Sequence, residues 1–249
     1  MHGFLGRGDD WLPIARALAD THYCLLPDLP GHGSHPPHRP LTFDTVTDGL
    51  ARLLAARQIE SLSLIGYSMG GRLALYYALK YPTHVQKLVL EGASPGLSAP
   101  AERQARAALD DDRAEQLRRH GIEPFVAQWY RAALFATLAA RPHLLARATA
   151  QRHKNNARWV ADVISALSPG RQPDLWPRLG HVSAPALLLA GELDAKFSEL
   201  SRQMAARMPQ ARVALLPQAG HNTHLEQPAA FTAVVQQFLV EPPQARAGE

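Results

Sequence analysis

The sequence predicts a doubly wound α/β fold with a mostly parallel sheet, and two observations lead to this prediction. The first is a set of short apolar runs between turn residues, each with the length of a strand buried on both faces. These runs cover residues 23–28, 62–67, 87–92, 186–192 and 213–218. The second is the helical spacing of apolar residues at 43–57, 69–81 and 228–239. Strands that alternate with helices favour a sheet covered by helices.

Residues 96–177 interrupt this alternation, because they carry helical patterns and no strand candidate. We therefore predict that they form a helical cap, inserted into an α/β core made of residues 1–95 and 178–240. The chain ends in a polar, Pro- and Gly-containing stretch, and we expect residues 241–249 to form a disordered tail.

Composition and charge exclude several classes of function. The chain has 249 residues, enough for one large domain or one domain with a sizeable insertion. Its net charge is +4, and the arginines are scattered, so we expect no nucleic-acid partner. No apolar run approaches the ~20 residues that span a bilayer, and no leader pattern is present, so we expect no membrane association. Cys24 is the single cysteine. These features favour a cytoplasmic enzyme, as a monomer or weak homo-oligomer.

Gly66, Ser68 and Gly70 match the pattern Gly-x-Ser-x-Gly, between the apolar run 62–67 and the helical pattern 69–81. In that setting the pattern predicts a sharp strand-to-helix turn that exposes the serine hydroxyl. The N-terminal amides of the following helix then point at the same site. The five residues alone are weak evidence, since many such serines only form turns.

Two further residues complete a catalytic triad in the chain order Ser, Asp, His. Asp194 follows the apolar run that ends near residue 192, and His221 follows the last run. Asp194 would fix the tautomer of the imidazole and stabilise its charged form. Glu192 and His224 are the alternatives, and we favour Asp194 and His221 from their positions after the strands.

An oxyanion site needs two backbone N–H groups. We predict that Met69, directly after the serine, supplies one and that Phe4, in the stretch His2-Gly3-Phe4, supplies the other. This stretch follows Met1 at once. If a strand normally leads into this stretch, it is missing here, and we then expect the N-terminal strands of the sheet to be shortened.

The remaining histidines and the cysteine suggest no cofactor. His32, His35 and His38 lie close in sequence, but neither a cysteine cluster nor an HExxH pattern accompanies them. We therefore predict no metal site and no cofactor. Cys24 lies inside an apolar run and is most simply a small buried hydrophobe.

Taken together, these residues resemble the α/β-hydrolase superfamily over nearly the whole chain. A narrower resemblance, to the 2-succinyl-6-hydroxy-2,4-cyclohexadiene-1-carboxylate synthases of menaquinone biosynthesis, rests on eight segments in order. The segments are GYSMGGR, EGASPGL, AERQAR, QWY, QRHKNN, QPDLWP, GELDAKF and AGHNTHLEQP. The Gly-x-Ser-x-Gly pattern is common to the superfamily, whereas Arg72, the PGL stretch and QRHKNN are more specific.

The resemblance implies a lyase on a hydrolase fold. Its reaction eliminates pyruvate from 2-succinyl-5-enolpyruvyl-6-hydroxy-3-cyclohexene-1-carboxylate, with the triad abstracting a ring proton and the two amides stabilising the developing oxyanion. The substrate has three carboxylates, which guanidinium groups suit well. By matching motifs, Arg72, Arg106 and Arg152 would bind them. The pocket would also be lined by Tyr67, Trp129, Tyr130 and Phe135.

Some assignments within these segments stay open. Arg103 lies one helical turn before Arg106 and is its rival, and Lys196 is a weaker candidate contact. The segment QRHKNN replaces a more Asn-rich stretch of the family, which leaves the roles of Asn155 and Asn156 open.

Two other functions compete with the lyase. A carboxylesterase or C–C bond hydrolase would use Ser68 as a covalent nucleophile. A non-catalytic relative would use the fold for binding. The arginines argue against the first, because neutral esters do not need them, and the complete triad argues against the second.

Overall fold

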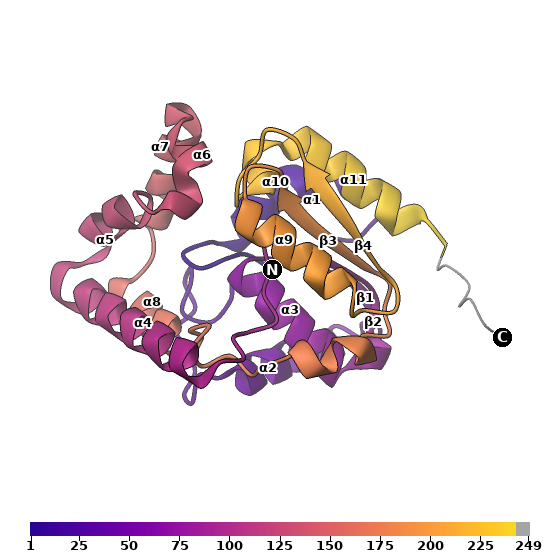
Figure 1. Cartoon of the computed structure of the whole chain (residues 1–249), viewed down its shortest axis with the longest axis horizontal. Coiled ribbons are helices and arrows are strands. Elements are labelled where there is room, and N and C mark those ends of the chain that lie inside the picture. The colour runs from indigo at the N-terminus through magenta and orange to yellow at the C-terminus, as the bar shows by residue number, and fades with distance from the viewer. Residues whose placement is uncertain (243–249) are drawn as a thin grey trace.

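The computed structural model describes residues 1–242, and its centre is a four-stranded parallel sheet (Figure 1). Its strands lie side by side in the order β1 (Leu62–Tyr67), β2 (Val85–Glu91), β3 (Ala186–Gly191) and β4 (Ala211–Leu216). Each neighbouring pair is parallel. Parallel strands need crossover connections, which helices supply here. The predicted α/β fold class is confirmed.

Helices cover both faces of the sheet, as the continuous apolar runs require. On one face lie α2 (Phe43–Ala56), α3 (Met69–Lys80) and α9 (Ala195–Ala205), and on the other α1 (Leu12–Leu18) and α11 (Pro228–Val240). Strand β2 contributes side chains to the apolar clusters on both faces. Leu88 and Leu90 belong to the cluster that includes α3, and Val89 belongs to the cluster that includes α11. Successive strand residues point to opposite faces, so an uninterrupted apolar run is buried on both.

Five helices between β2 and β3 form a separate group beside the sheet (Figure 1). They are α4 (Pro100–His120), α5 (Ile122–Trp129), α6 (Ala136–Ala139), α7 (Pro142–Arg152) and α8 (Ala157–Ala166). All five fall within the predicted cap range, 96–177. They share an apolar cluster that includes Leu117, Val126 and Val160, and Leu5 from the N-terminal loop packs into it. The cap is thus fastened to the core beside the N-terminal loop.

The prediction of a strand at residues 23–28 is wrong, because within the described part of the chain these residues pair with no strand. Tyr67 of β1 donates its backbone N–H to the carbonyl of Met1 at 3.1 Å. A cavity of about 500 Å³ separates the rest of β1 from residues 22–27. An apolar run becomes a strand only where a neighbouring strand supplies its hydrogen-bond partners. Cys24, expected inside that strand, is half-buried outside the sheet.

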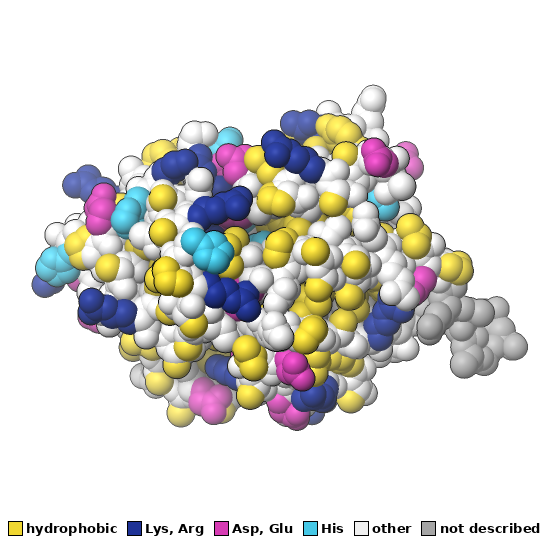
Figure 2. Space-filling model, turned by 90° about the horizontal axis from the view of Figure 1, so that it is seen from above, with side chains coloured by type: hydrophobic (Ala, Val, Ile, Leu, Met, Phe, Trp, Pro, Cys, Tyr) yellow, Lys and Arg dark blue, Asp and Glu magenta, His cyan; other side chains and the backbone are white. Residues whose placement is uncertain are grey.

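No strand precedes β1 in the described residues, and the shortening of the N-terminal strands stays a prediction. The predicted tail, 241–249, lies outside the described residues except for its first two positions. On the face shown in Figure 2, Lys and Arg side chains are spread among acidic and hydrophobic ones rather than gathered in one patch.

Candidate active site

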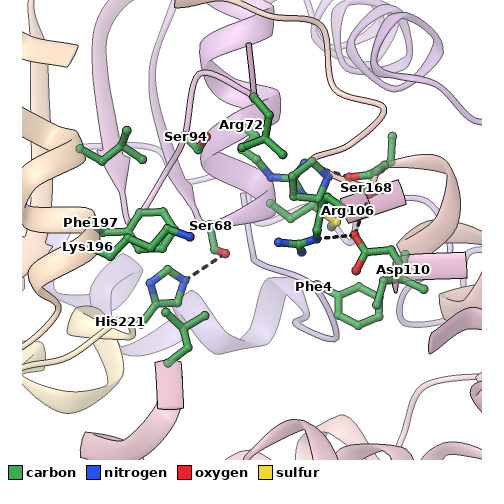
Figure 3. Close-up of a pocket in the computed structure, with 18 of the residues that line it drawn as sticks. Phe4, Ser68, Arg72, Ser94, Arg106, Asp110, Ser168, Lys196, Phe197 and His221 are labelled. Atoms are coloured by element: carbon green, nitrogen blue, oxygen red, sulfur yellow. Dashed lines mark hydrogen bonds and ion pairs between the residues drawn. The ribbon is translucent and has the colours of Figure 1, made fainter. Parts of the chain in front are cut away.

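A cavity of about 810 Å³ lies where the carboxyl ends of the strands meet the cap (Figure 3). Its core side includes Ser68, directly after β1, and His221, in the loop after β4. Its cap side includes Trp129 of α5 and Arg152 of α7. The carboxyl ends of parallel strands meet at one edge of a sheet, so residues distant in sequence converge there.

Ser68 occupies the strained turn that its sequence pattern predicts. Its φ is 50° and its ψ is −110°, and α3 begins at the next residue. A Cβ on Gly66 would lie 2.4 Å from the carbonyl oxygen of Gly70, so only glycine permits the close passage of strand and helix. The turn directs the hydroxyl of Ser68 toward His221 (Figure 3).

The three predicted triad residues lie within hydrogen-bond distance in series. His221 Nε2 is 3.2 Å from Ser68 Oγ, and His221 Nδ1 is 2.9 Å from Asp194 Oδ2. Asp194 is itself held by the backbone N–H of Phe197, which donates to its Oδ1 at 3.1 Å. A carboxylate beside Nδ1 requires the proton there, which leaves Nε2 able to accept the proton of the serine.

The two alternatives to the triad residues lie elsewhere. Glu192 is exposed to solvent. His224 Nδ1 is 2.7 Å from Glu91 Oε2, and this buried pair lies beside the cavity rather than on it. The geometry therefore favours Asp194 and His221 over their neighbours.

The backbone N–H groups of Phe4 and Met69 donate no hydrogen bond within the described residues. Both residues line the cavity beside Ser68. Met69 is the first residue of α3, where the N–H groups have no partner inside the helix and the dipole favours negative charge. The two amides thus have no acceptor within the described residues, and their role as oxyanion donors stays a prediction.

Two buried histidines hold the loop that carries Phe4. Leu5 donates its backbone N–H to His32 Nε2 at 3.1 Å, and Leu29 donates its own to His2 Nε2 at 2.9 Å. Both acceptor nitrogens must be unprotonated, so both rings are neutral. Burial agrees with this, because it lowers the pKa of His2 well below its usual value and that of His32 to about 4.

Arg72 lines the cavity and is 9% exposed. Its Nη1 donates to the carbonyl of Leu167 at 2.8 Å and to Gln172 Oε1 at 3.3 Å, and its guanidinium lies 5.7 Å from the centroid of the Phe43 ring. Within residues 1–242, no carboxylate oxygen lies within 4.0 Å of it. Burial lowers its pKa to about 9, so it is still charged at neutral pH. Its charge faces the cavity without an acidic partner in the described chain.

Arg106 and Arg152 also line the cavity, but each is paired with a carboxylate. Arg106 Nε donates to Asp110 Oδ2 at 2.8 Å, and Asp110 is completely buried. Arg152 Nη1 lies 2.9 and 2.7 Å from the two carboxylate oxygens of Asp10. The three predicted arginines therefore line one cavity. Arg106 and Arg152 each form an ion pair, whereas Arg72 forms none within the described residues.

The other candidate residues are Arg103, Asn155 and Asn156 of the cap and Lys196 of α9. Arg103 donates to two backbone carbonyls and does not line the cavity, unlike Arg106. Asn155 donates to the carbonyl of Leu5 at 2.8 Å and so helps to fix the loop of Phe4, and Asn156 caps the N-terminus of α8. Lys196 lines the cavity beside Phe197 (Figure 3).

Four aromatic residues named from the sequence line the cavity: Tyr67, Trp129, Tyr130 and Phe135. Two of them flank the triad histidine. The ring centroid of Tyr67 lies 5.4 Å from that of His221, and the ring of Phe135 lies 6.1 Å from it. Such rings exclude water from around the imidazole and strengthen the electrostatic interactions inside the cavity.

Sequence reasoning missed the acidic partners of the arginines. Asp110 could have been found, because it lies four residues after Arg106 on one helix, a spacing that brings opposite charges together. Asp10 is separated from Arg152 by 142 positions and belongs to a different part of the fold. No local pattern signals such a pair.

Among the described residues, no group of three or more His, Cys, Asp or Glu side chains could hold a metal ion. His35 and His38 line a separate surface pocket, away from the triad. None of the helices in residues 1–242 has both the length and the apolar character that crossing a membrane requires.

Known proteins resemble this chain in sequence and in structure. The family model described as alpha/beta hydrolase fold matches residues 1–228. A 2-succinyl-6-hydroxy-2,4-cyclohexadiene-1-carboxylate synthase of Serratia proteamaculans is 39% identical, over 97% of this chain and 92% of that protein. The chloroplastic protein PHYLLO of Arabidopsis thaliana is 31% identical over 96% of this chain, which spans only 15% of PHYLLO.

The solved structure of MenH from S. aureus superposes with a TM-score of 0.92 at 34% identity, and the match covers 96% of this chain and 91% of that one. The fold is thus shared over nearly the full length. The chain belongs to the alpha/beta hydrolase fold family and, within it, to the 2-succinyl-6-hydroxy-2,4-cyclohexadiene-1-carboxylate synthases.

Proposed function

We propose that this protein is a carbon–oxygen lyase. It eliminates pyruvate from 2-succinyl-5-enolpyruvyl-6-hydroxy-3-cyclohexene-1-carboxylate and yields 2-succinyl-6-hydroxy-2,4-cyclohexadiene-1-carboxylate. The observation that carries the proposal is a buried cation, Arg72, without an acidic partner in the described chain, in the same cavity as the Ser68, His221 and Asp194 series. A cavity that holds a base and an uncompensated guanidinium suits a substrate with acidic carbon–hydrogen bonds and carboxylates.

The triad acts as a base in this reaction. His221 Nε2 takes the proton of Ser68, and the serine oxygen removes the proton from ring carbon 2, next to the succinyl ketone. The electrons of that bond form the double bond between carbons 2 and 3. The original double bond moves to carbons 4 and 5, and the bond from carbon 5 to the enolpyruvyl oxygen breaks. The departing enolpyruvate takes up one proton and becomes pyruvate, so the atoms balance.

Negative charge develops on the succinyl ketone oxygen as the proton leaves. The N–H groups of Phe4 and Met69 are the donors that stabilise it, since both face the cavity and neither is occupied within the described chain. His2 and His32 support one of these donors by holding the loop of Phe4 in place. Preorganised donors of this kind contribute about 3 kcal/mol each to a transition state.

The arginines bind the carboxylates of the substrate. Arg72 supplies positive charge, because its hydrogen bonds within the described chain go to neutral oxygen atoms. Arg152 acts mainly as an oriented N–H donor, because Asp10 balances its charge. Arg106 shares the single carboxylate of Asp110 with Arg113, so it retains part of its positive charge. The substrate is thus a small tricarboxylate, and the absence of a metal or organic cofactor stays a prediction. The cytoplasmic location and the monomeric or weakly oligomeric state remain predictions.

Hydrolysis of an ester or of a carbon–carbon bond is the second candidate. It is favoured by the 3.2 Å distance from Ser68 Oγ to His221 Nε2, which also suits a serine that is acylated. The test gives the purified protein the enolpyruvyl substrate and, in parallel, a panel of short-chain aryl esters. We expect rapid pyruvate release with negligible ester cleavage. Ester cleavage without pyruvate release would replace the lyase by the hydrolase.

A further inference from the structure

A buried carboxylate lies behind the arginines of the cavity. Asp110 of α4 borders the cavity, but its side chain is completely buried. It accepts hydrogen bonds from Arg106 Nε at 2.8 Å, from Arg113 Nη1 at 2.9 Å and from the hydroxyl of Ser168 at 2.7 Å. Arg106 and Arg113 lie four residues before it and three residues after it, so one face of the helix presents all three side chains. The proton transfers of the proposed reaction do not use this carboxylate.

Asp110 holds Arg106 by one edge of its guanidinium group. The carboxylate binds Nε, and within residues 1–242 the terminal nitrogens of Arg106 form no hydrogen bond. Figure 3 shows the guanidinium between Asp110 and Ser68, with its bonded nitrogen toward the carboxylate. A charge-assisted hydrogen bond restricts the direction of such a group. The N–H groups of the terminal nitrogens are therefore directed into the cavity.

The same carboxylate holds the turn after α8, residues 167–172. The hydroxyl of Ser168, which is 1% exposed, donates to Asp110 Oδ2, and its oxygen accepts the backbone N–H of Gly170 at 3.0 Å. The turn lies so close to α4 that a Cβ on Gly170 would be 2.4 Å from the carbonyl oxygen of Arg103. Asp110 thus fastens the turn to α4 at a place where the two backbones are already in contact.

This turn supplies the hydrogen-bond partners of Arg72. Arg72 Nη1 donates to the carbonyl of Leu167 at 2.8 Å and to Gln172 Oε1 at 3.3 Å, and both residues belong to the turn. The backbone N–H of Gln172 donates in turn to the carbonyl of Ser168 at 2.9 Å. Asp110 is therefore connected to Arg72 through Ser168 and the turn.

Two guanidinium groups that share a cavity need such support. Burial is the main reason why the pKa of Arg72 is lowered to about 9; the charge of Arg106 lowers this pKa as well, and that of Asp110 raises it. Like charges repel each other strongly where water is excluded, and they turn apart unless the protein holds them. A carboxylate behind them reduces the repulsion and leaves the N–H groups that face the cavity free for a ligand.

We propose that Asp110 is a positioning residue for the binding of substrate carboxylates, which directs Arg106 by direct contact and Arg72 through Ser168 and the turn after α8. Its buried side chain does not touch the substrate. The charges of Arg106 and Arg113 outweigh its own, so the cluster still attracts an anion. The inference rests on the proposed function for the identity of that anion. Loss of Asp110 should weaken substrate binding more than it slows the chemical step, because the triad does not depend on it.

The first test compares a buried and an exposed carboxylate on the same helix. Asp110→Asn keeps the shape of the side chain and removes its charge. Asp112→Asn is the control, since Asp112 is exposed and within the described residues accepts only from Gln116. In Asp110→Asn we expect KM for pyruvate release to rise about tenfold or more with kcat within about threefold, while Asp112→Asn resembles the wild type. A merely structural role would reduce the amount of active enzyme and so lower kcat without raising KM, and that result would overturn the proposal.

The second test needs no substrate and separates the direct link from the indirect one. The side-chain N–H resonances of Arg72 and Arg106 are followed by NMR in the free protein and are assigned by their loss in Arg72→Lys and Arg106→Lys. Asp110→Asn should shift both sets, and Asp112→Asn should shift neither.

Ser168→Ala removes only one buried hydroxyl, so it keeps the proposal testable if Asp110→Asn does not fold. We expect it to shift the resonances of Arg72 more than those of Arg106, because only the link through the turn is cut. Resonances of Arg72 that stay unchanged in Ser168→Ala would overturn the proposal. Absence of pyruvate release from the wild type would instead reject the lyase and leave the NMR test valid.

Discussion

Arg152 of the cap binds both carboxylate oxygens of Asp10, at 2.9 and 2.7 Å, although 142 positions separate the two residues. Arg152 lines the cavity, and the side chains of Arg152 and Asp10 are 7% and 16% exposed. It joins α7 to the segment that follows the N-terminal loop. The arginine therefore has two roles, because it presents N–H groups to the cavity and fastens the cap to the core.

We predict that Arg152→Met costs both stability and activity. Removal of the guanidinium leaves Asp10 largely buried without its partner, and the free energy of unfolding should fall by ~3 kcal/mol. The double variant Arg152→Met with Asp10→Asn should regain part of that stability but not the activity. Urea unfolding and pyruvate release measured on both variants test this prediction. Equal stability of the single variant and the wild type would contradict it.

Substitution of Ser68 by Ala should abolish turnover and leave binding largely intact. In the proposed mechanism the hydroxyl relays the proton to His221, and the arginines and aromatic residues that line the cavity remain in place. The rate of pyruvate release should fall by at least ~10³-fold. Calorimetric titration with the reaction product measures binding separately. A collapse of binding in this variant would mean that the serine does more than transfer protons.

Arg72→Ala should weaken catalysis far more than the loss of a surface charge. The guanidinium is buried, and its charge has no acidic partner in the described chain, so a carboxylate bound there would lose a charge-assisted contact. We expect kcat/KM to fall at least ~100-fold, with Arg72→Lys only partly active because it lacks the planar fork. Arg202→Ala, on the exposed side of α9, serves as the control. Near-normal activity of Arg72→Ala would remove this residue from the site.

Acid should destabilise the protein through its two buried neutral histidines. Burial lowers the pKa of His32 from 6.5 to about 4, so the unfolded chain binds a proton that the folded chain excludes. The stabilisation is complete above pH 6.5 and is lost as the pH falls toward 4, by an amount on the order of 3 kcal/mol. Urea midpoints between pH 4 and 7 should therefore depend less on pH in His32→Gln than in the wild type. His35→Gln, at an exposed position, should keep the wild-type dependence.

The members of the triad could be named from the sequence because each has a local signal. Ser68 lies in a five-residue pattern, and Asp194 and His221 each follow an apolar run that forms a strand. Parallel strands bring their carboxyl ends to one edge, so the topology places the three residues together without further information. The same reasoning failed for residues 23–28, where the apolar run is present and a neighbouring strand is not.

The sequence alone determined the fold class, the order of the motifs and the residue types at the site, because periodicity and turn chemistry are local properties of a chain. The tertiary structure decided which charges are paired: Arg152 binds Asp10, Arg106 shares Asp110 with Arg113, and Arg72 contacts only neutral oxygen atoms in the described chain. It also decided that Ser168 joins Asp110 to the turn that binds Arg72. Such contacts form between segments that only folding brings together, and no spacing along the chain encodes their distances.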